Sequence, residues 1–94
     1  MNHIPSIEVL KATHDFPTQY TFKAIGKAEA DFVHRVVSSV REELGRTEDP
    51  PHRVREAAGG RHVAVTLELR LANAEQIRAV YERILKVEGL TLLF

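Results

Sequence analysis

The clearest pattern in the chain is a strict alternation of apolar and polar residues over positions 62–71. The apolar members are Val63, Val65, Leu67, Leu69 and Leu71. A period of two is typical of a β-strand that buries one face and exposes the other. The pattern therefore predicts a strand here, with the valine and leucine side chains in a core and the intervening side chains in water.

A second pattern, with apolar residues at helical spacing, runs through residues 29–44. Its stripe consists of Phe32, Val33, Val36, Val37, Val40 and Leu44. This spacing predicts an amphipathic helix over 29–44. Glu29 and Asp31 then fall in the first turn, where carboxylates suit the positive end of the helix dipole. Gly45 is placed to end the helix.

A second helix is predicted after Asn73, which stands three residues before Gln76 in a capping-box arrangement. The apolar stripe of this helix is Ile77, Val80, Tyr81, Ile84 and Leu85. Gly89 follows the last apolar residues of the pattern and is a typical helix stop.

Residues 18–26 predict the first strand. Tyr20 and Phe22 share one face of it, and these two aromatic residues mark the face that is buried. Gly26 ends the strand, because glycine permits the sharp turn into the helix that follows.

The remaining strands are short. Residues 53–57 predict a weak strand, and Gly59-Gly60 predicts the hairpin turn that joins it to the alternating strand, because both glycines tolerate positive φ. Residues 90–94 predict a last strand. Residues 1–15 form an N-terminal lead-in, in which Ser6 is placed to cap a short helical turn.

Together these elements predict a single α+β domain over residues 16–94, in the order βαββαβ. Both predicted helices are apolar on one side, and the clearest strand alternates. The simplest arrangement that buries these apolar sides places both helices on one face of a four-stranded antiparallel sheet. Right-handed connections then give the ferredoxin-like sandwich with strand order 4-1-3-2.

The composition narrows the class of protein. The chain has 94 residues, with 13 basic and 13 acidic side chains. A balanced chain gives no general reason to bind nucleic acid or an anionic membrane. The absence of cysteine excludes disulfides, thiolate zinc sites and a cysteine nucleophile. No signal peptide and no long apolar run stand out, so we expect a cytoplasmic protein that does not enter a membrane.

Several segments resemble the YbeD-like family of small bacterial proteins (domain of unknown function 493). The first is the phenylalanine-proline entry into the first strand: Phe16, Pro17, Tyr20, Thr21, Phe22, Lys23 and Gly26. The second is the glycine-led alternating strand, followed by the helix with Gln76 and Tyr81. The resemblance covers residues 16–94. It implies a ferredoxin-like fold similar to ACT regulatory domains, which bind amino acids or other small effectors, and it implies no reaction.

A first candidate site follows the first strand. Gly26 and the start of the next helix could bind a small anion through backbone N–H groups, with Lys23 or Lys27 as the counter-charge. The alternative is that Gly26 serves only the tight turn between strand and helix.

A second candidate is a basic edge made by Arg53, Arg55 and Arg61 around the hairpin. Such an edge could meet an acidic partner or bind nucleic acid weakly. The alternative is that these charges protect a sheet edge and keep the protein soluble.

A third candidate is the apolar last strand, with Leu90, Leu92 and Phe94 as interface residues of a homodimer or of a complex with another protein. No metal ligands or cofactor are predicted, because no two histidines stand four residues apart on a helix. No catalytic residues are predicted either, because the sequence shows no nucleophile together with a base and a group that would orient the base.

The leading hypothesis is therefore a non-enzymatic regulatory or protein-interaction module. A small-molecule effector-binding protein of the ACT-like kind is the alternative. Weak nucleic-acid binding through the arginine-bearing edge is a lesser alternative.

Overall fold

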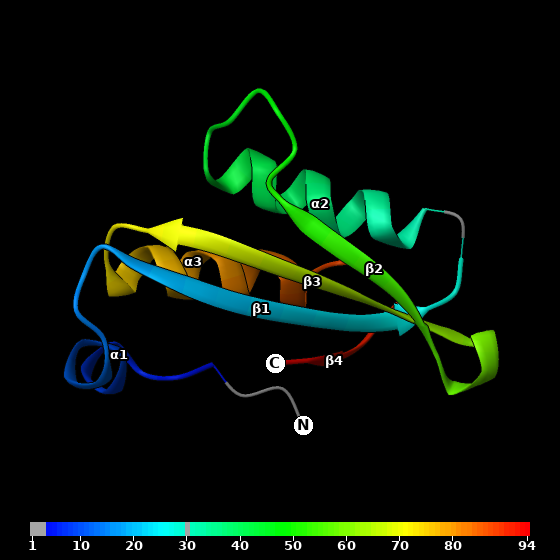
Figure 1. The fold of residues 1–94 in the computed structure, drawn as a ribbon, viewed down its shortest axis with the longest axis horizontal. Coiled ribbons are helices and arrows are strands. Elements are labelled where there is room, and N and C mark those ends of the chain that lie inside the picture. Colours follow the sequence, from blue (N-terminus) through cyan, green and yellow to red (C-terminus); the bar gives the residue numbers. More distant parts are fainter. Residues whose placement is uncertain (1–3, 30) are drawn as a thin grey trace.

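The structure of the protein is a computed structural model, which describes residues 4–29 and 31–94 (Figure 1). In chain order the elements are α1 (Ile7–Thr13), β1 (Thr18–Lys27), α2 (Phe32–Glu43), β2 (His52–Ala57), the 3₁₀ turn η1 (Ala58–Gly60), β3 (His62–Leu71), α3 (Ala74–Leu85) and β4 (Leu90–Leu93).

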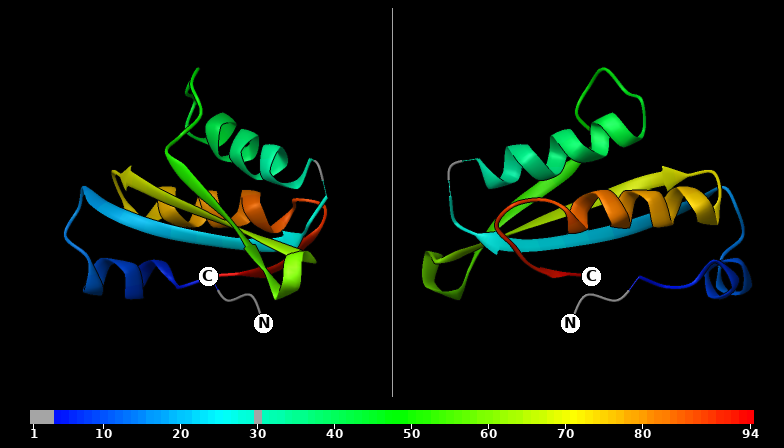
Figure 2. Two further views of the ribbon diagram at one scale, coloured as in Figure 1. Left: turned by 45° about the vertical axis from the view of Figure 1, so that its right-hand side comes forward. Right: turned by 180° about the vertical axis from the view of Figure 1, so that it is seen from behind.

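The four strands form one antiparallel sheet in the order β2-β3-β1-β4. Read from the other edge, this is the predicted order 4-1-3-2, so the ferredoxin-like α+β arrangement is confirmed. Helices α2 and α3 both lie on one face of the sheet, as the view from behind makes clear (Figure 2, right). Figure 1 looks on to the other face, which no helix crosses.

The core lies between the sheet and these two helices. Phe22 of β1 and Leu67 of β3 stand opposite each other at its centre, and both are fully buried. The helices contribute most of their predicted stripes, including Phe32, Val36 and Ile84, but the prediction for Leu85 is wrong, because its side chain is exposed. Because strand side chains alternate between faces, the same register sends the residues between these core positions to the uncovered face.

The predicted strands agree with the structure within one residue, and β3 agrees throughout. The predicted start of the first helix at Glu29 is wrong, because α2 begins at Phe32. The reason is that β1 runs on to Lys27, and the backbone N–H of Glu29 then donates to the carbonyl of Lys27 in a tight turn (2.8 Å). Asp31 is the residue before the helix rather than a member of its first turn.

The second helix begins as predicted, with one difference in its cap. The Asn73 side chain accepts a hydrogen bond from the backbone N–H of Gln76 (2.8 Å). The Gln76 side chain reaches back to the N–H of Ala72 (2.8 Å), one residue further than the capping box requires. Both bonds satisfy backbone donors that would otherwise have no partner at a helix start.

The lead-in packs on the domain from residue 4 onward; residues 1–3 of the predicted lead-in lie outside the described part. Ser6 caps α1 by accepting a hydrogen bond from the N–H of Val9 (3.1 Å), as predicted. Leu10 is only 1% exposed and joins the core, and α1 packs against α3. Arg78 of α3 donates to the carbonyl oxygen of Pro5 (2.7 Å). Within the described chain, no helix is long and apolar enough to cross a membrane.

Candidate functional site

The uncovered face of the sheet places side chains from three strands next to one another. In the register of β1, β3 and β2, Thr66 lies between Lys23 and Arg53. In the next row Ala64 lies between Ile25 and Arg55. We call the surface formed by these six residues the open face. It brings together cations that are far apart in the sequence.

A shallow hollow lies in the middle of the open face, over Ala64. Its volume is about 320 Å³, and its lining includes Lys23, Arg53, Arg55 and Thr66. The hollow exists because Ala64 has a short side chain, whereas Lys23, Arg53 and Arg55 around it have long ones. Three cationic side chains and one hydroxyl group therefore surround a floor made by a methyl group.

The charges around this hollow are largely unopposed. Arg53 pairs with Glu68 of the neighbouring strand at 2.6 Å, but the Arg53 side chain remains 73% exposed, so the pair contributes little. In residues 4–29 and 31–94 no ion pair joins Lys23, Arg55 or Arg70 to a carboxylate. The open face is therefore positive although the chain as a whole is neutral.

The strands and the helices differ in how their charges are balanced. Charged residues on the strands are Lys23, Lys27, Arg53, Arg55 and Arg70 against Glu56 and Glu68. On the helical side Arg35, Arg41 and Arg83 each form an ion pair with a carboxylate. The strands therefore carry a net positive charge, although the chain as a whole is neutral.

One end of the open face is apolar. Leu92 of β4 stands opposite Ile25. Phe94 follows β4 and exchanges two backbone hydrogen bonds with Lys23 (3.0 and 2.8 Å), yet Phe94 is 60% exposed. We call Ile25, Leu92 and Phe94 the apolar corner.

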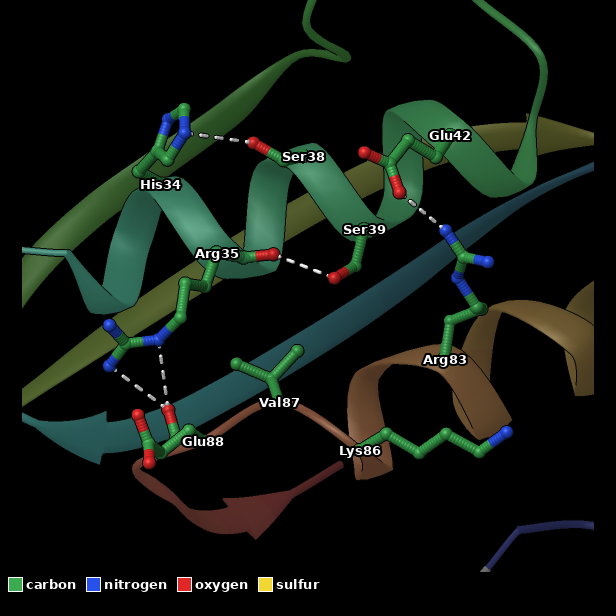
Figure 3. Close-up of a pocket in the computed structure, with 9 residues that line it drawn as sticks. All are labelled: His34, Arg35, Ser38, Ser39, Glu42, Arg83, Lys86, Val87 and Glu88. Atoms are coloured by element: carbon green, nitrogen blue, oxygen red, sulfur yellow. Dashed lines mark hydrogen bonds and ion pairs between the residues drawn. The ribbon is translucent and has the colours of Figure 1, made fainter.

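A second depression lies between α2 and α3 on the helical side (Figure 3). Its polar groups mostly bind one another: Arg35 donates to the carbonyl oxygen of Glu88 (3.2 and 3.3 Å), and Arg83 pairs with Glu42 (2.8 Å). Ser39 donates to the carbonyl of Arg35 (2.7 Å). The Arg83–Glu42 pair joins α3 to α2, and Arg35 joins α2 to the segment after α3, so we interpret this groove as a contact region between packed elements.

The structure separates the residues of the first candidate site. A Cβ atom on Gly26 would overlap the ring of Phe32, so the glycine is required by the packing of that ring. Lys23 belongs to the open face, and Lys27 ends β1, where its N–H donates to the carbonyl of Gly89 (3.0 Å). The cation beside this turn is Arg35, and it is already paired with Glu29 (3.4 Å).

The second candidate site is divided. Arg53 and Arg55 lie on the open face, whereas Arg61 lies in the hairpin connection, where its carbonyl oxygen accepts from the N–H of Ala28 (3.1 Å). The third is divided too. Leu90 packs against the core on the helical side, and only Leu92 and Phe94 belong to the apolar corner.

Ala64 and Thr66 are intervening positions of the alternating strand 62–71, so the sequence predicts both for the uncovered face. What it does not predict is the hollow itself, in which Ala64 is only 5% exposed among Lys23, Arg53 and Arg55. The hairpin register also follows from that strand, since Ala57 opposite His62 places Arg55 opposite Ala64.

An aromatic cluster lies on the helix-covered side of the sheet, near α1. The hydroxyl groups of Tyr20 and Tyr81 are 3.0 Å apart, and the rings of Phe22 and Tyr81 meet edge to face. Burial, together with the hydrogen bond to Tyr20, raises the pKa of Tyr81 well above its usual value. Tyr81 therefore stays protonated at any physiological pH and contributes packing rather than a titrating group. Across the part of the chain that the structure describes, no three metal-ligating side chains converge.

These features define a small ferredoxin-like α+β protein with one sheet face covered by helices and one face uncovered and basic. The chain belongs to the family described as "Protein of unknown function (DUF493)", whose model matches residues 11–93.

Three bacterial relatives, each named a UPF0250 protein, are similar to this chain. The protein from Erwinia tasmaniensis is 28% identical over 84% of this chain and 88% of its own length. The protein from Paraburkholderia phymatum is 30% identical over 71% of this chain and 75% of its own length. The protein from Pasteurella multocida is 26% identical over 89% of this chain and 93% of its own length.

Proposed function

We propose that this protein is a non-enzymatic module that regulates another protein by docking through the open face of its sheet. The observation that carries the proposal is the hollow over Ala64, where Lys23 and Arg55 form no ion pair in the described chain and Arg53 forms only an exposed one, beside an exposed apolar corner. A protein surface that combines exposed apolar area with unpaired charge is suited to a partner.

The arrangement of possible nucleophiles also supports a non-enzymatic role. Ser38 and His34 come within 3.4 Å on the surface of α2. In the described chain, however, no carboxylate contacts the other ring nitrogen of His34. A serine needs a base that is itself held in place, together with donors for the developing oxyanion. The Ser38–His34 pair is therefore interpreted as a surface contact one helical turn apart.

The docking proposal is tested by blocking each surface in turn. The variant Thr66→Trp fills the centre of the open face without changing its charge, and Ser38→Trp does the same to the groove in Figure 3. Proteins captured from a bacterial extract by the two variants are compared with those captured by the wild type. We expect a partner that Thr66→Trp loses and Ser38→Trp keeps. A partner lost only with Ser38→Trp would contradict the proposal.

Self-association is a second candidate, favoured by the apolar corner. We propose that two copies associate weakly through Leu92 and Phe94. The corner is small, whereas a stable interface buries roughly 800 Å² on each partner. Association is therefore expected to appear only as protein concentration rises.

Light scattering over a range of concentrations tests this second candidate. The mass is expected to rise from monomer toward dimer, and the double variant Leu92→Lys, Phe94→Lys is expected to stay monomeric. Leu90→Lys is not a suitable probe, because Leu90 packs against the core and its replacement would disturb folding. A wild type that is monomeric at every concentration rejects self-association.

A further inference from the structure

The docking proposal leaves the chemistry of the partner open, and the open face itself points to that chemistry. We propose that the partner presents an acidic protein segment, whose carboxylates bind Lys23, Arg53 and Arg55 around the hollow over Ala64. This inference rests on the proposed docking function and names the kind of surface that the module recognises.

Charge complementarity is the first argument. Four cations, Lys23, Arg53, Arg55 and Arg70, lie on the uncovered side of three adjacent strands, and the carboxylate among them, Glu68, is already engaged by Arg53. A positive surface attracts an acidic partner and steers its approach. The same surface repels a second copy of itself, so it does not serve the self-association proposed for the apolar corner.

Geometry is the second argument. Lys23 and Arg53 flank Thr66 from the two neighbouring strands, so their backbones are two strand spacings apart, roughly 10 Å. A chain in the polyproline II conformation has three residues per turn and rises about 3.1 Å per residue, so carboxylates three residues apart lie on one side, about 9 Å apart, and would reach both cations. Arginine can bind a carboxylate through two parallel N–H bonds, which favours planar acidic groups. The Thr66 hydroxyl group between the cations adds a neutral donor.

The exposure of the cations argues against a free small anion as the ligand. Ligand pockets enclose most of their ligand. Here the side chains of Lys23 and Arg55 lie on an open surface, and the Arg53 side chain is mostly exposed. A carboxylate held here needs further contacts, and a protein segment that also covers the surrounding strand surface supplies them.

The placement of the aromatic residues argues against nucleic acid. Sheets of this topology that bind RNA stack bases on aromatic side chains of the two central strands. In this chain Phe22 of β1 is buried under the helices, and Tyr20 shares its face. On the uncovered face, β3 presents Ala64, Thr66, Glu68 and Arg70, which offer no stacking surface.

The test uses the full chain and a labelled 12-residue peptide with Glu at every third position and Ala or Ser elsewhere. A peptide with Gln in place of each Glu is its control. Fluorescence anisotropy at low salt measures binding of the peptide to the wild type and to two double variants. One combines Lys23→Glu with Arg55→Glu. The other combines Arg46→Glu with Lys86→Glu. The two variants change the net charge equally. Arg46 and Lys86 are exposed and lie away from the open face.

We expect the Glu peptide to bind the wild type and the Arg46, Lys86 variant alike, and to lose at least about tenfold in affinity with the Lys23, Arg55 variant, since two charge-assisted contacts are reversed. The Gln peptide is expected not to bind. Thermal melting confirms that each variant is folded.

Three results would overturn the inference. Equal weakening in the two double variants would show a response to net charge alone. Tighter binding of a single-stranded oligouridylate than of the Glu peptide at the same salt concentration would make nucleic acid the ligand. Displacement of the peptide by millimolar inorganic phosphate would make the hollow a small-anion site.

The docking function can be judged apart from these results. If Thr66→Trp loses a partner that Lys23→Glu, Arg55→Glu still binds, then docking stands and the acidic partner is rejected. If neither variant changes capture, docking through the open face is rejected as well.

Discussion

Replacing Gly26 by alanine is expected to lower the free energy of unfolding by about 3 kcal/mol, at the upper end of what overpacking a core costs. A Cβ atom at this position would overlap the Phe32 ring and lie 2.7 Å from the carbonyl oxygen of Gly89, closer than the 3.0 Å that real Cβ atoms respect. Phe32 is fully buried and starts α2, so the ring has no free space to enter. Urea unfolding measures the loss.

Gly45→Ala is the matched control, because it separates steric overlap from backbone strain. Gly45 has a φ of +64° and nothing within 4 Å of an added Cβ, so only the left-handed backbone is penalised, by about 1 kcal/mol. Combining Gly26→Ala with Phe32→Leu is expected to cost less than the sum of the two single changes, because the two residues are in contact. A Gly26→Ala variant as stable as the wild type would refute this packing.

Replacing Leu10 by alanine is expected to cost about 3 kcal/mol, which for a chain of this size lowers the melting temperature by roughly 12–24 °C. The reason is that Leu10 is the residue of α1 that enters the core, at 1% exposure, and the methyl groups removed would leave a cavity. Thermal unfolding followed by circular dichroism measures the shift.

Val9→Ala is the control on the same helix, since Val9 is 53% exposed and its change is expected to cost less than about 0.5 kcal/mol. If Leu10→Ala and Val9→Ala have equal and small effects, α1 does not contribute to the stability of the domain. The lead-in would then be an appendage rather than part of the folded unit.

The sheet order could be predicted because the signals for it are local and agree with one another. Strict alternation over 62–71 identifies a central strand, and the glycine pair before it identifies the hairpin to β2. The two amphipathic stripes then leave one economical way to cover the sheet. Each of these inferences uses residues within one element or one turn.

The neighbours on the open face could not be predicted in the same way. Alternation determines which face a residue occupies, but a slip of two residues between β1 and β3 would preserve every face. Lys23 stands opposite Thr66 in the register that also places Phe22 opposite Leu67 in the core, and these residues are far apart in the chain. For this reason the sequence predicts Lys23 and Thr66 for the same face of the sheet, but it does not predict that Lys23 and Arg53 flank Thr66.

The predicted start of α2 is wrong for a related reason. Glu29 has a favourable helix-start chemistry, but the chain between β1 and α2 must cross from the sheet to the helical layer. The hydrogen bond from the N–H of Ala28 to the carbonyl of Arg61 holds this crossing to the hairpin (3.1 Å), and Glu29 is then engaged by Arg35. Neither contact is visible in the local pattern.

The central claim, that the open face is the surface that meets a partner, is tested most directly by nuclear magnetic resonance with the partner identified by capture. The Ala64 methyl group and the Nε–H groups of Arg53 and Arg55 report on the open face, and the Nε–H group of Arg83 reports on the helical groove. The account predicts that adding the unlabelled partner shifts the three open-face signals and leaves Arg83 unchanged. Shifts confined to Arg83 would contradict it.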